Sequence, residues 1–200
     1  MSVAKNLQTL LKIDCLKIHV DDPLAESKLA WDVMSRLQKN CIPGDRTKVL
    51  LCIGTDRSTG DCLGPLVGTK VNAFGQNYFH IFGTLEEPVH AGNLKEKIEQ
   101  IKNLYEDPFI IAVDASLGRL ESVGFINIGD GSIMPGAGVN KELPPVGDLH
   151  ITGVVNVGGF LEFLVLQNTR LNTVMRMAEV IAKGLARTAN ELSNKLPGVT

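Results

Sequence analysis

Two short hydrophobic runs constrain the fold of this chain more than any other feature of its sequence. They span residues 49–54, with the sequence VLLCIG, and residues 109–114, with the sequence FIIAVD. Runs this short that are apolar at nearly every position are typical of strands buried on both faces of a parallel sheet. The sequence therefore predicts an α/β protein built around such a sheet.

The segments around these runs alternate between helical and extended patterns. Helices predicted at residues 61–74 and 93–105 flank a strand predicted at 78–82. This alternation implies right-handed βαβ units and a mainly parallel, twisted sheet. The remaining patterns predict strands at 16–20, 124–128 and 149–155, helices at 23–40, 160–166 and 169–192, and one domain over residues 1–200 with a frayed leader at 1–15.

Composition excludes several classes of function. The net charge is −2, no basic stripe stands out, and aromatic residues make up 5% of the chain, so we expect no nucleic-acid partner. We find no signal peptide and no apolar run long enough to span a membrane, which predicts a cytoplasmic protein without a membrane partner. The four cysteines form no C-x-x-C pair, which argues against a zinc ribbon or a redox motif.

Two acidic residues stand where ligands bind in such folds. Asp114 ends the second hydrophobic run, and Asp61 follows the first run after a polar loop. Ligands of open parallel sheets bind beyond the carboxyl ends of the strands, so both carboxylates would face one crevice. The pair could share a proton and act as acid and base, or bind a divalent metal through its oxygens. The structural alternatives are a helix N-cap for Asp61 and a turn hydrogen bond for Asp114.

Other residues are candidates for the same site. His90 and His150 are each interpreted either as a proton carrier or metal ligand, or as a hydrogen-bonded structural histidine. Asp56 lies on the polar loop before Asp61, where it is a substrate contact or part of a local ion pair with the neighbouring arginine. The long Gly- and Pro-rich loop at 129–147 is of the kind that usually has a function, and the glycines we select in it as substrate contacts are Gly136 and Gly138.

Alternative chemistries have weaker support in the sequence. A thiolate at Cys62 is disfavoured by the carboxylate of its neighbour Asp61. The glycine spacing near Asp61 matches neither a P-loop nor a dinucleotide-binding motif, and no G-x-S-x-G elbow is present. We therefore expect no cofactor, with a divalent metal at the aspartate pair as the alternative.

Several motifs resemble those of the germination (spore) protease family, over about residues 49–165. They are Gly54 with Asp61 seven positions later, the sequence LGPLV at 63–67, and the segments 88–93, 111–115, 133–141 and 151–155. The loop at 54–61 is similar to that of the shorter, spore-protease-related sporulation proteins. The resemblance implies a three-layer α/β/α sandwich that the family shares, more distantly, with hydrogenase maturation peptidases.

The same resemblance implies a function. The two essential aspartates of the spore protease match Asp61 and Asp114, and the expected substrate is a peptide or a small acid-soluble spore protein in a sporulating cell. In the hydrogenase maturation peptidases the matching acidic positions help to bind nickel in the partner. A homo-oligomer is compatible with this picture.

The chain also departs from the family pattern. Thr55 replaces the asparagine that follows the first glycine, the chain is shorter than a spore protease, and no propeptide is evident. Two hypotheses follow. In the first, the protein is a hydrolase whose aspartates activate water while backbone N–H groups at 136–138 bind the oxyanion. In the second, it is a non-catalytic relative that keeps the pocket to bind a peptide, a metal or a partner.

Overall fold

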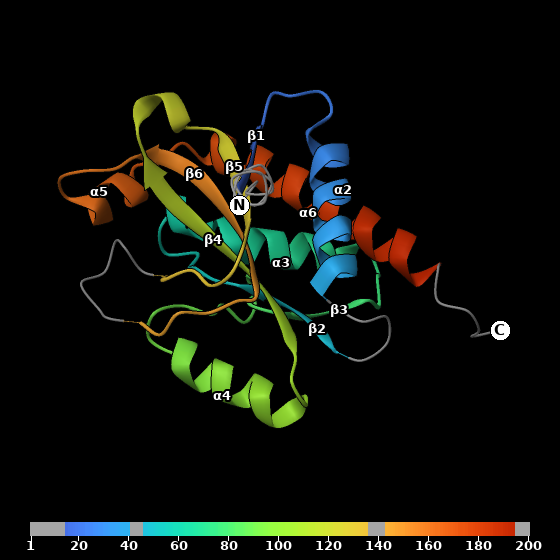
Figure 1. Ribbon diagram of the computed structural model, residues 1–200. Helices are drawn as coiled ribbons and strands as arrows, with labels where there is room; N and C mark the ends of the chain where they lie inside the picture. The colour runs from blue at the N-terminus through green and yellow to red at the C-terminus, as the bar shows by residue number, and fades with distance from the viewer. Residues whose placement is uncertain (1–14, 41–45, 136–142, 195–200) are drawn as a thin grey trace, which may run out of the picture.

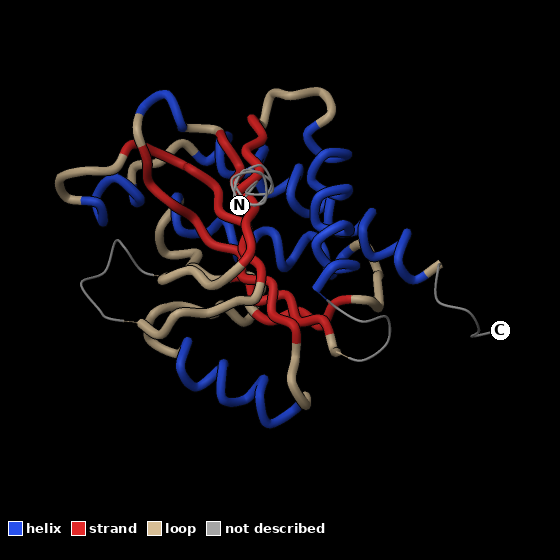
Figure 2. Tube along the Cα trace, in the orientation of Figure 1, coloured by secondary structure: helices blue, strands red, loops and turns tan. Residues whose placement is uncertain are grey.

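The computed structural model describes residues 15–40, 46–135 and 143–194, which form a twisted six-stranded sheet with helices on both faces (Figures 1 and 2). The strand order is β1-β5-β6-β4-β2-β3. The elements are β1 (Cys15–His19), α2 (Ala25–Asn40), β2 (Lys48–Cys52), a 3₁₀ turn (Gly60–Cys62), α3 (Leu63–Ala73), β3 (Phe79–Phe82), α4 (Leu94–Leu104), β4 (Phe109–Gly118), a second 3₁₀ turn (Leu120–Ser122), β5 (Phe125–Asp130), β6 (Leu149–Val157), α5 (Glu162–Gln167) and α6 (Leu171–Ser193).

The sheet is mixed but mainly parallel, as the sequence predicts. Strands β3, β2, β4 and β6 run parallel to one another, whereas β5 pairs antiparallel with β6, and β1 pairs antiparallel with β5 at the edge. Helix α3 connects β2 to β3, and helix α4 connects β3 to β4 on the other side of β2. Right-handed crossovers in opposite directions place these two helices on opposite faces of the sheet.

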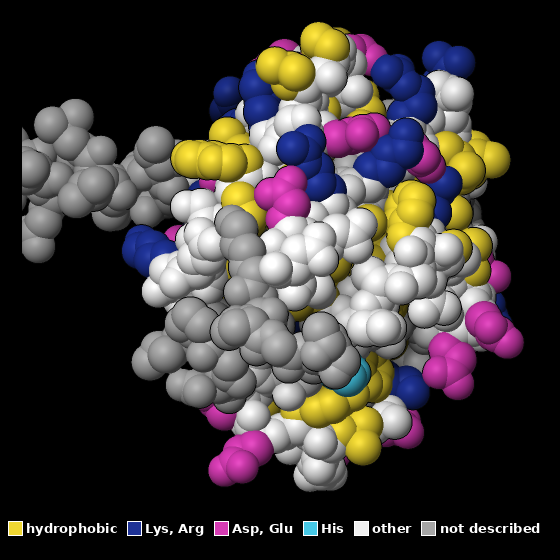
Figure 3. All heavy atoms as spheres, turned by 90° about the vertical axis from the view of Figure 1, so that its right-hand side faces the viewer, with side chains coloured by type: hydrophobic (Ala, Val, Ile, Leu, Met, Phe, Trp, Pro, Cys, Tyr) yellow, Lys and Arg dark blue, Asp and Glu magenta, His cyan; other side chains and the backbone are white. Residues whose placement is uncertain are grey.

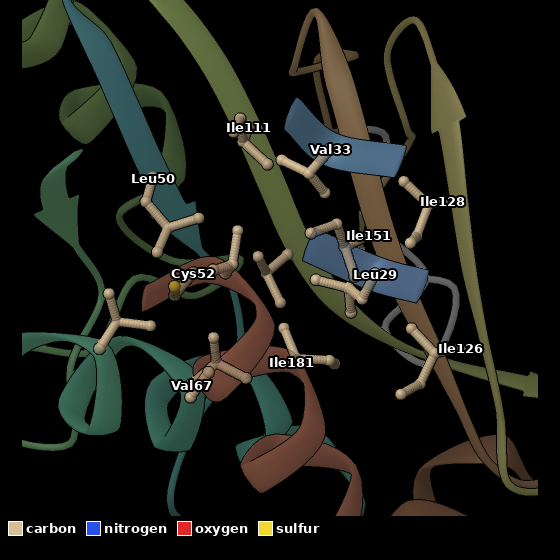
Figure 4. Packing of buried hydrophobic residues seen from close by; sticks show 14 of the residues in the cluster. Leu29, Val33, Leu50, Cys52, Val67, Ile111, Ile126, Ile128, Ile151 and Ile181 are labelled. Atoms are coloured by element: carbon tan, nitrogen blue, oxygen red, sulfur yellow. The ribbon is translucent and has the colours of Figure 1, made fainter. Parts of the chain in front are cut away.

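Two hydrophobic clusters, one on each face of the sheet, confirm the three layers. Alternate residues of β2 divide between them, with Leu50 and Cys52 facing α2, α3 and α6, and Val49 and Leu51 facing α4. Figure 4 shows the larger cluster, in which Leu50 and Ile151 of the sheet meet side chains of the covering helices. Both runs identified in the sequence are therefore buried on two sides.

Helix α6 covers the centre of one face. Its buried stripe contains the apolar residues expected from helical spacing, including Val174, Met177, Ile181 and Leu185. Its outer side forms ion pairs with neighbouring helices, such as Lys70 of α3 with Glu179 at 2.6 Å. In Figure 3, which shows the molecule from the right-hand side of Figure 1, acidic and basic side chains are interspersed without a continuous patch of either sign.

The second hydrophobic run forms a longer strand than the sequence predicts. We expected it to end at Asp114, but β4 continues to Gly118. The reason is its partner: β6 pairs with β4 from Ile111 to Gly118, whereas β2 on the other side stops at Val113. Asp114 therefore lies inside a strand, at the level where the neighbouring strand ends. Among the described helices, none has the length and hydrophobicity needed to cross a membrane.

Candidate active site

Close backbone contacts fix the loop that carries Asp61. Gly54 has a φ of +140°, and a Cβ atom there would lie 1.9 Å from the carbonyl oxygen of Asp61. The N–H of Thr55 donates to the same carbonyl oxygen at 3.1 Å. At Gly64, in the first turn of α3, a Cβ atom would lie 2.1 Å from the carbonyl oxygen of Ile53. Only glycine fits at both positions, so the spacing of these glycines sets where Asp61 sits.

Asp114 is positioned by β4. It shares a side of the strand with Ile110 and Ala112, which pack in the cluster on the α4 face. Asp114 itself is 7% exposed, and one carboxyl oxygen accepts a hydrogen bond from the N–H of Ala115 at 2.8 Å. A carboxyl group this deeply buried beside a pocket is an unusual choice for packing alone.

The two aspartates line one pocket of about 350 Å³, a volume within the range of about 300–1,000 Å³ that is common for small-molecule sites. Four segments enclose it: the loop after β2, the turn before α4, the end of β4, and α5. Pro135 and Leu143 also line it. The lining includes Thr55, Asp56, Ser58, Asp61, Pro88, His90, Asp114, Ala115, Ser116, Leu117, Leu143, Phe163 and Leu166.

The two carboxyl groups have different electrostatic environments. Burial raises the pKa of Asp61, while the Thr55 N–H and the protonated form of His90 act in the opposite direction. The pKa of Asp114 is raised well above its usual range, by its deeper burial and by the charge on Asp61, and the Ala115 N–H offsets this only in part. A proton shared by the pair therefore resides on Asp114, and Asp61 is the partner that ionises first.

His90 is held at the pocket by its own turn. Its backbone N–H donates to the Asn93 side-chain oxygen at 2.8 Å, and the Asn93 amide donates to the carbonyl of Pro88 at 3.1 Å. The ring nitrogen Nδ1 accepts from the N–H of Gly92 at 3.0 Å. Asn93 directly precedes α4, but its side chain ties this turn together and makes no hydrogen bond to the helix end.

The remaining predicted site residues are placed differently. Asp56 lines the pocket on its exposed rim. His150 lies on β6 outside the pocket, where its Nδ1 is 3.0 Å from the carbonyl oxygen of Gly131. The structure thus does not bring His150 into the pocket with the two aspartates. Gly136 and Gly138 lie outside the described residues, so the oxyanion role expected for that segment stays a prediction.

The structure adds residues to the site that have no clear signal in the sequence. Ser58 is 7% exposed, and its hydroxyl is the one buried side-chain polar atom in the described chain that has no hydrogen-bond partner. Phe163 and Leu166 of α5 supply an apolar wall, although Phe163 is 53% exposed. The apolar character of the short helix at 160–166 was visible in the sequence, but its place beside the pocket depends on the path of the chain after β6.

Two alternative chemistries can be compared with this geometry. Cys62 is buried with its Sγ 2.9 Å from the carbonyl oxygen of Thr59, and burial followed by the charges of Asp61 and Asp56 raises the pKa of its thiol. These effects oppose a thiolate nucleophile. Within the described ranges, no group of three or more His, Cys, Asp or Glu side chains is arranged to hold a metal ion. The aspartate pair could thus supply only part of a coordination shell.

Comparisons with known proteins identify relatives of this chain. It is 63% identical over 140 residues to the "Uncharacterized protein YyaC" of Bacillus subtilis (strain 168), covering 70% of this chain and 68% of that protein.

Two solved structures are weakly similar in fold. One is the [NiFe] hydrogenase maturation protease HycI of Thermococcus kodakarensis KOD1, with a TM-score of 0.42 and 17% identity over 74% of this chain and 98% of that one. The other is a hydrogenase 3 maturation protease, with a TM-score of 0.43 and 18% identity over 69% of this chain and 88% of that one. The model of the family described as "Protein of unknown function (DUF1256)" matches residues 17–184, and the chain belongs to this family.

Proposed function

We propose that this protein is a peptidase-like hydrolase in which Asp61 and Asp114 act together on a peptide bond. The observation that carries the proposal is the pair of carboxyl groups on one pocket, one of them buried with its pKa raised well above the usual range. Two titratable groups whose environments separate their pKa values are suited to act as base and acid. The resemblance to the germination protease family supports the same pair of residues.

The two aspartates would have distinct roles in the reaction. Asp61, the more exposed and more readily ionised group, takes a proton from water as the water oxygen bonds to the peptide carbonyl carbon. Asp114, which holds its proton, donates it to the amide nitrogen as the carbon–nitrogen bond breaks. The cycle closes when a proton moves from Asp61 to Asp114 through solvent, so the step consumes one water and leaves an acid and an amine.

The substrate proposed for this reaction is an unfolded segment of a small spore protein, cleaved in the cytoplasm of a sporulating cell. This part of the proposal rests on the resemblance of the motifs around Asp61 and Asp114. The pocket is compatible with it, since Pro88, Leu143 and Leu166 provide apolar walls for side chains near the cleaved bond.

The test is incubation of the protein with small acid-soluble spore proteins and identification of fragments by mass spectrometry. Asp61→Asn and Asp114→Asn each preserve shape but remove acid–base capacity, and we expect cleavage to fall by at least about 10²-fold in each. Glu86→Gln, at an exposed position away from the pocket, is the matched control and should cleave normally. Cleavage that survives either aspartate substitution would remove that residue from the mechanism.

A second candidate function is peptide binding without cleavage. The observation that favours it is Thr55, which lines the pocket in place of the asparagine typical of the peptidases that this chain resembles. A pocket that binds unfolded polypeptide in the assay above, yet yields no fragments over long incubation, would establish this second function. Cleavage that a metal chelator abolishes would instead point to a metal-dependent hydrolase at the same pair.

A further inference from the structure

Within the described ranges, strand β4 has an unpaired edge next to Asp114. The pairing of β4 with β2 ends at Val113, whose carbonyl accepts from the N–H of Ile53 at 2.7 Å. On the other side, β6 follows β4 as far as Gly118. No strand of the described chain pairs with β4 on the β2 side beyond Val113.

The backbone groups at this edge can be assigned from strand alternation. In a parallel sheet, successive residues of a central strand direct their N–H and C=O groups to opposite neighbours. Val113 bonds to the β2 side, and the carbonyl of Gly118 accepts from Gly158 after β6 at 2.7 Å. The register between β4 and β6 shifts between Ser116 and Leu117, where β6 has one extra residue, but Gly118 beyond the shift still bonds toward β6. Ala115 and Leu117 therefore face the side that β2 has left. The N–H of Ala115 is used by the Asp114 carboxyl, so among the described residues the edge offers the Ala115 carbonyl and both backbone groups of Leu117.

This edge opens into the pocket. Residues 115–117 line it together with both aspartates. The unpartnered hydroxyl of Ser58 lines the same pocket from the loop after β2. Buried polar groups nearly always have a hydrogen-bond partner, so a hydroxyl left without one points to a polar ligand that supplies it.

Apolar side chains continue the pocket along the direction of β4. Phe163 and Leu166 of α5 line it, and Figure 1 shows α5 beside the carboxyl ends of β4 and β6. Phe163 is half exposed, although it is a large aromatic side chain. A ligand on this edge would thus meet backbone hydrogen-bonding groups along its length and apolar surface at its flank.

We infer that the ligand is an extended polypeptide segment that adds to the edge of β4 as an extra strand, pairing with residues 115–117. Such strand addition takes affinity from backbone hydrogen bonds and selectivity from pockets for alternate side chains. It would carry the peptide backbone past Asp114 and Ser58 and place an apolar side chain against Phe163. This inference deepens the proposed function, since it describes how its peptide substrate binds, but the binding does not require cleavage.

Peptide backbone methylation tests the inference directly. The probe is a blocked heptapeptide of alternating valine and threonine with a fluorescent label, titrated into the Asp61→Asn protein and followed by anisotropy. Two further copies are N-methylated, one at every valine and one at every threonine. An added strand uses only alternate N–H groups, so we expect one methylated copy to bind at least about tenfold more weakly and the other to bind normally.

A protein variant tests the edge from the other side. Leu117→Pro removes the N–H that faces the edge, whereas Leu117→Ala shortens the same side chain and keeps the N–H. Proline is tolerated on the open edges of strands, and we expect about tenfold weaker binding for the proline variant than for the alanine variant. In the protein with Leu117 intact, hydrogen exchange at the Leu117 amide should slow when the unmethylated peptide is added, which gives a readout that does not depend on folding of the variant.

The outcomes separate this inference from the proposed function. Equal binding of all three peptides, no binding of the unmethylated peptide at millimolar concentration, or unchanged exchange at Leu117 would each overturn strand addition. Peptide that binds with the alternating pattern but is never cleaved by the wild-type protein would leave strand addition in place and contradict the hydrolase. Cleavage of spore proteins together with equal binding of the methylated and unmethylated peptides would support the hydrolase and contradict strand addition.

Discussion

Replacing Gly54 with alanine tests whether close backbone packing holds Asp61 in place. The new Cβ would lie 1.9 Å from the Asp61 carbonyl oxygen and 3.1 Å from Cδ of Pro65, so the loop must retreat by about 1.5 Å to restore an ordinary contact. The φ of +140° is also unfavourable for alanine, at a cost of about 1–3 kcal/mol. Overpacking adds about 1–3 kcal/mol more, so we expect the free energy of unfolding to fall by about 2–6 kcal/mol.

The chain contains a matched control for the backbone part of this cost. Gly159 has a φ of +142°, but a Cβ atom there would meet nothing within 4 Å. Gly159→Ala should therefore lower the free energy of unfolding only by the cost of the unfavourable φ, about 1–3 kcal/mol. Urea denaturation followed by circular dichroism measures both variants, and the comparison is valid if their m-values agree.

The two variants should also differ in function. A shift of about 1 Å at a catalytic group can cost about 10²-fold in rate, so cleavage should collapse in Gly54→Ala and persist in Gly159→Ala under conditions where both are folded. If Gly54→Ala is as stable and as active as Gly159→Ala, the contact between Gly54 and Asp61 does not position the carboxylate, and our reasoning is refuted.

Three further predictions follow from the electrostatics and hydrogen bonding of the pocket. The pKa of Asp114 in the folded protein lies above its value of about 3.9 in the unfolded chain. The contribution of Asp114 to stability is therefore full below about pH 3.9 and is lost as the pH rises through the folded pKa. Asp114→Asn should lack this decline, which melting curves from pH 4 to 8 would reveal. Ser58→Ala should leave the free energy of unfolding unchanged or raise it by about 1 kcal/mol, and it should weaken peptide binding. The control Thr188→Val removes a buried hydroxyl that is hydrogen-bonded to Ala30 and Gly184, and it should lower the free energy of unfolding by about 1 kcal/mol. Destabilisation by Ser58→Ala would show that the Ser58 hydroxyl is paired. A protonated His90 ring lowers the pKa of Asp61, and His90→Gln removes this effect. The acid limb of the cleavage profile should therefore move to higher pH, and an unmoved limb would contradict that role.

The fold was largely predictable because its signals are local. Runs such as 49–54 are apolar at every position that packs between two layers of helices, and the stripe on α6 follows helical spacing. The aspartates could be selected for a similar reason, because strand ends and glycine spacing can be recognised in the sequence itself. What linked Asp61 to Asp114 was the general geometry of parallel sheets.

The rest of the site depends on contacts that are distant in sequence. Polar residues after Val113 suggested the end of a strand, but β6, which lies far along the chain, continues to pair with β4. The histidines looked equivalent in the sequence, and only the turn made by Asn93 and the hydrogen bond to Gly131 separate His90 from His150. The unpartnered state of Ser58 has no sequence signal, because it is a property of its three-dimensional surroundings.

The backbone packing at Gly54 has a consequence for how this site can change over time. Its contact is with the main chain of Asp61, so the backbone locates the acid without help from the side chains of Asp56 and Arg57. Asp56 and Arg57 are exposed on that connection. Mutation can therefore exchange these side chains with little structural penalty, and related proteins could acquire new ligand preferences on this rim while the carboxylate behind it stays in register with β4.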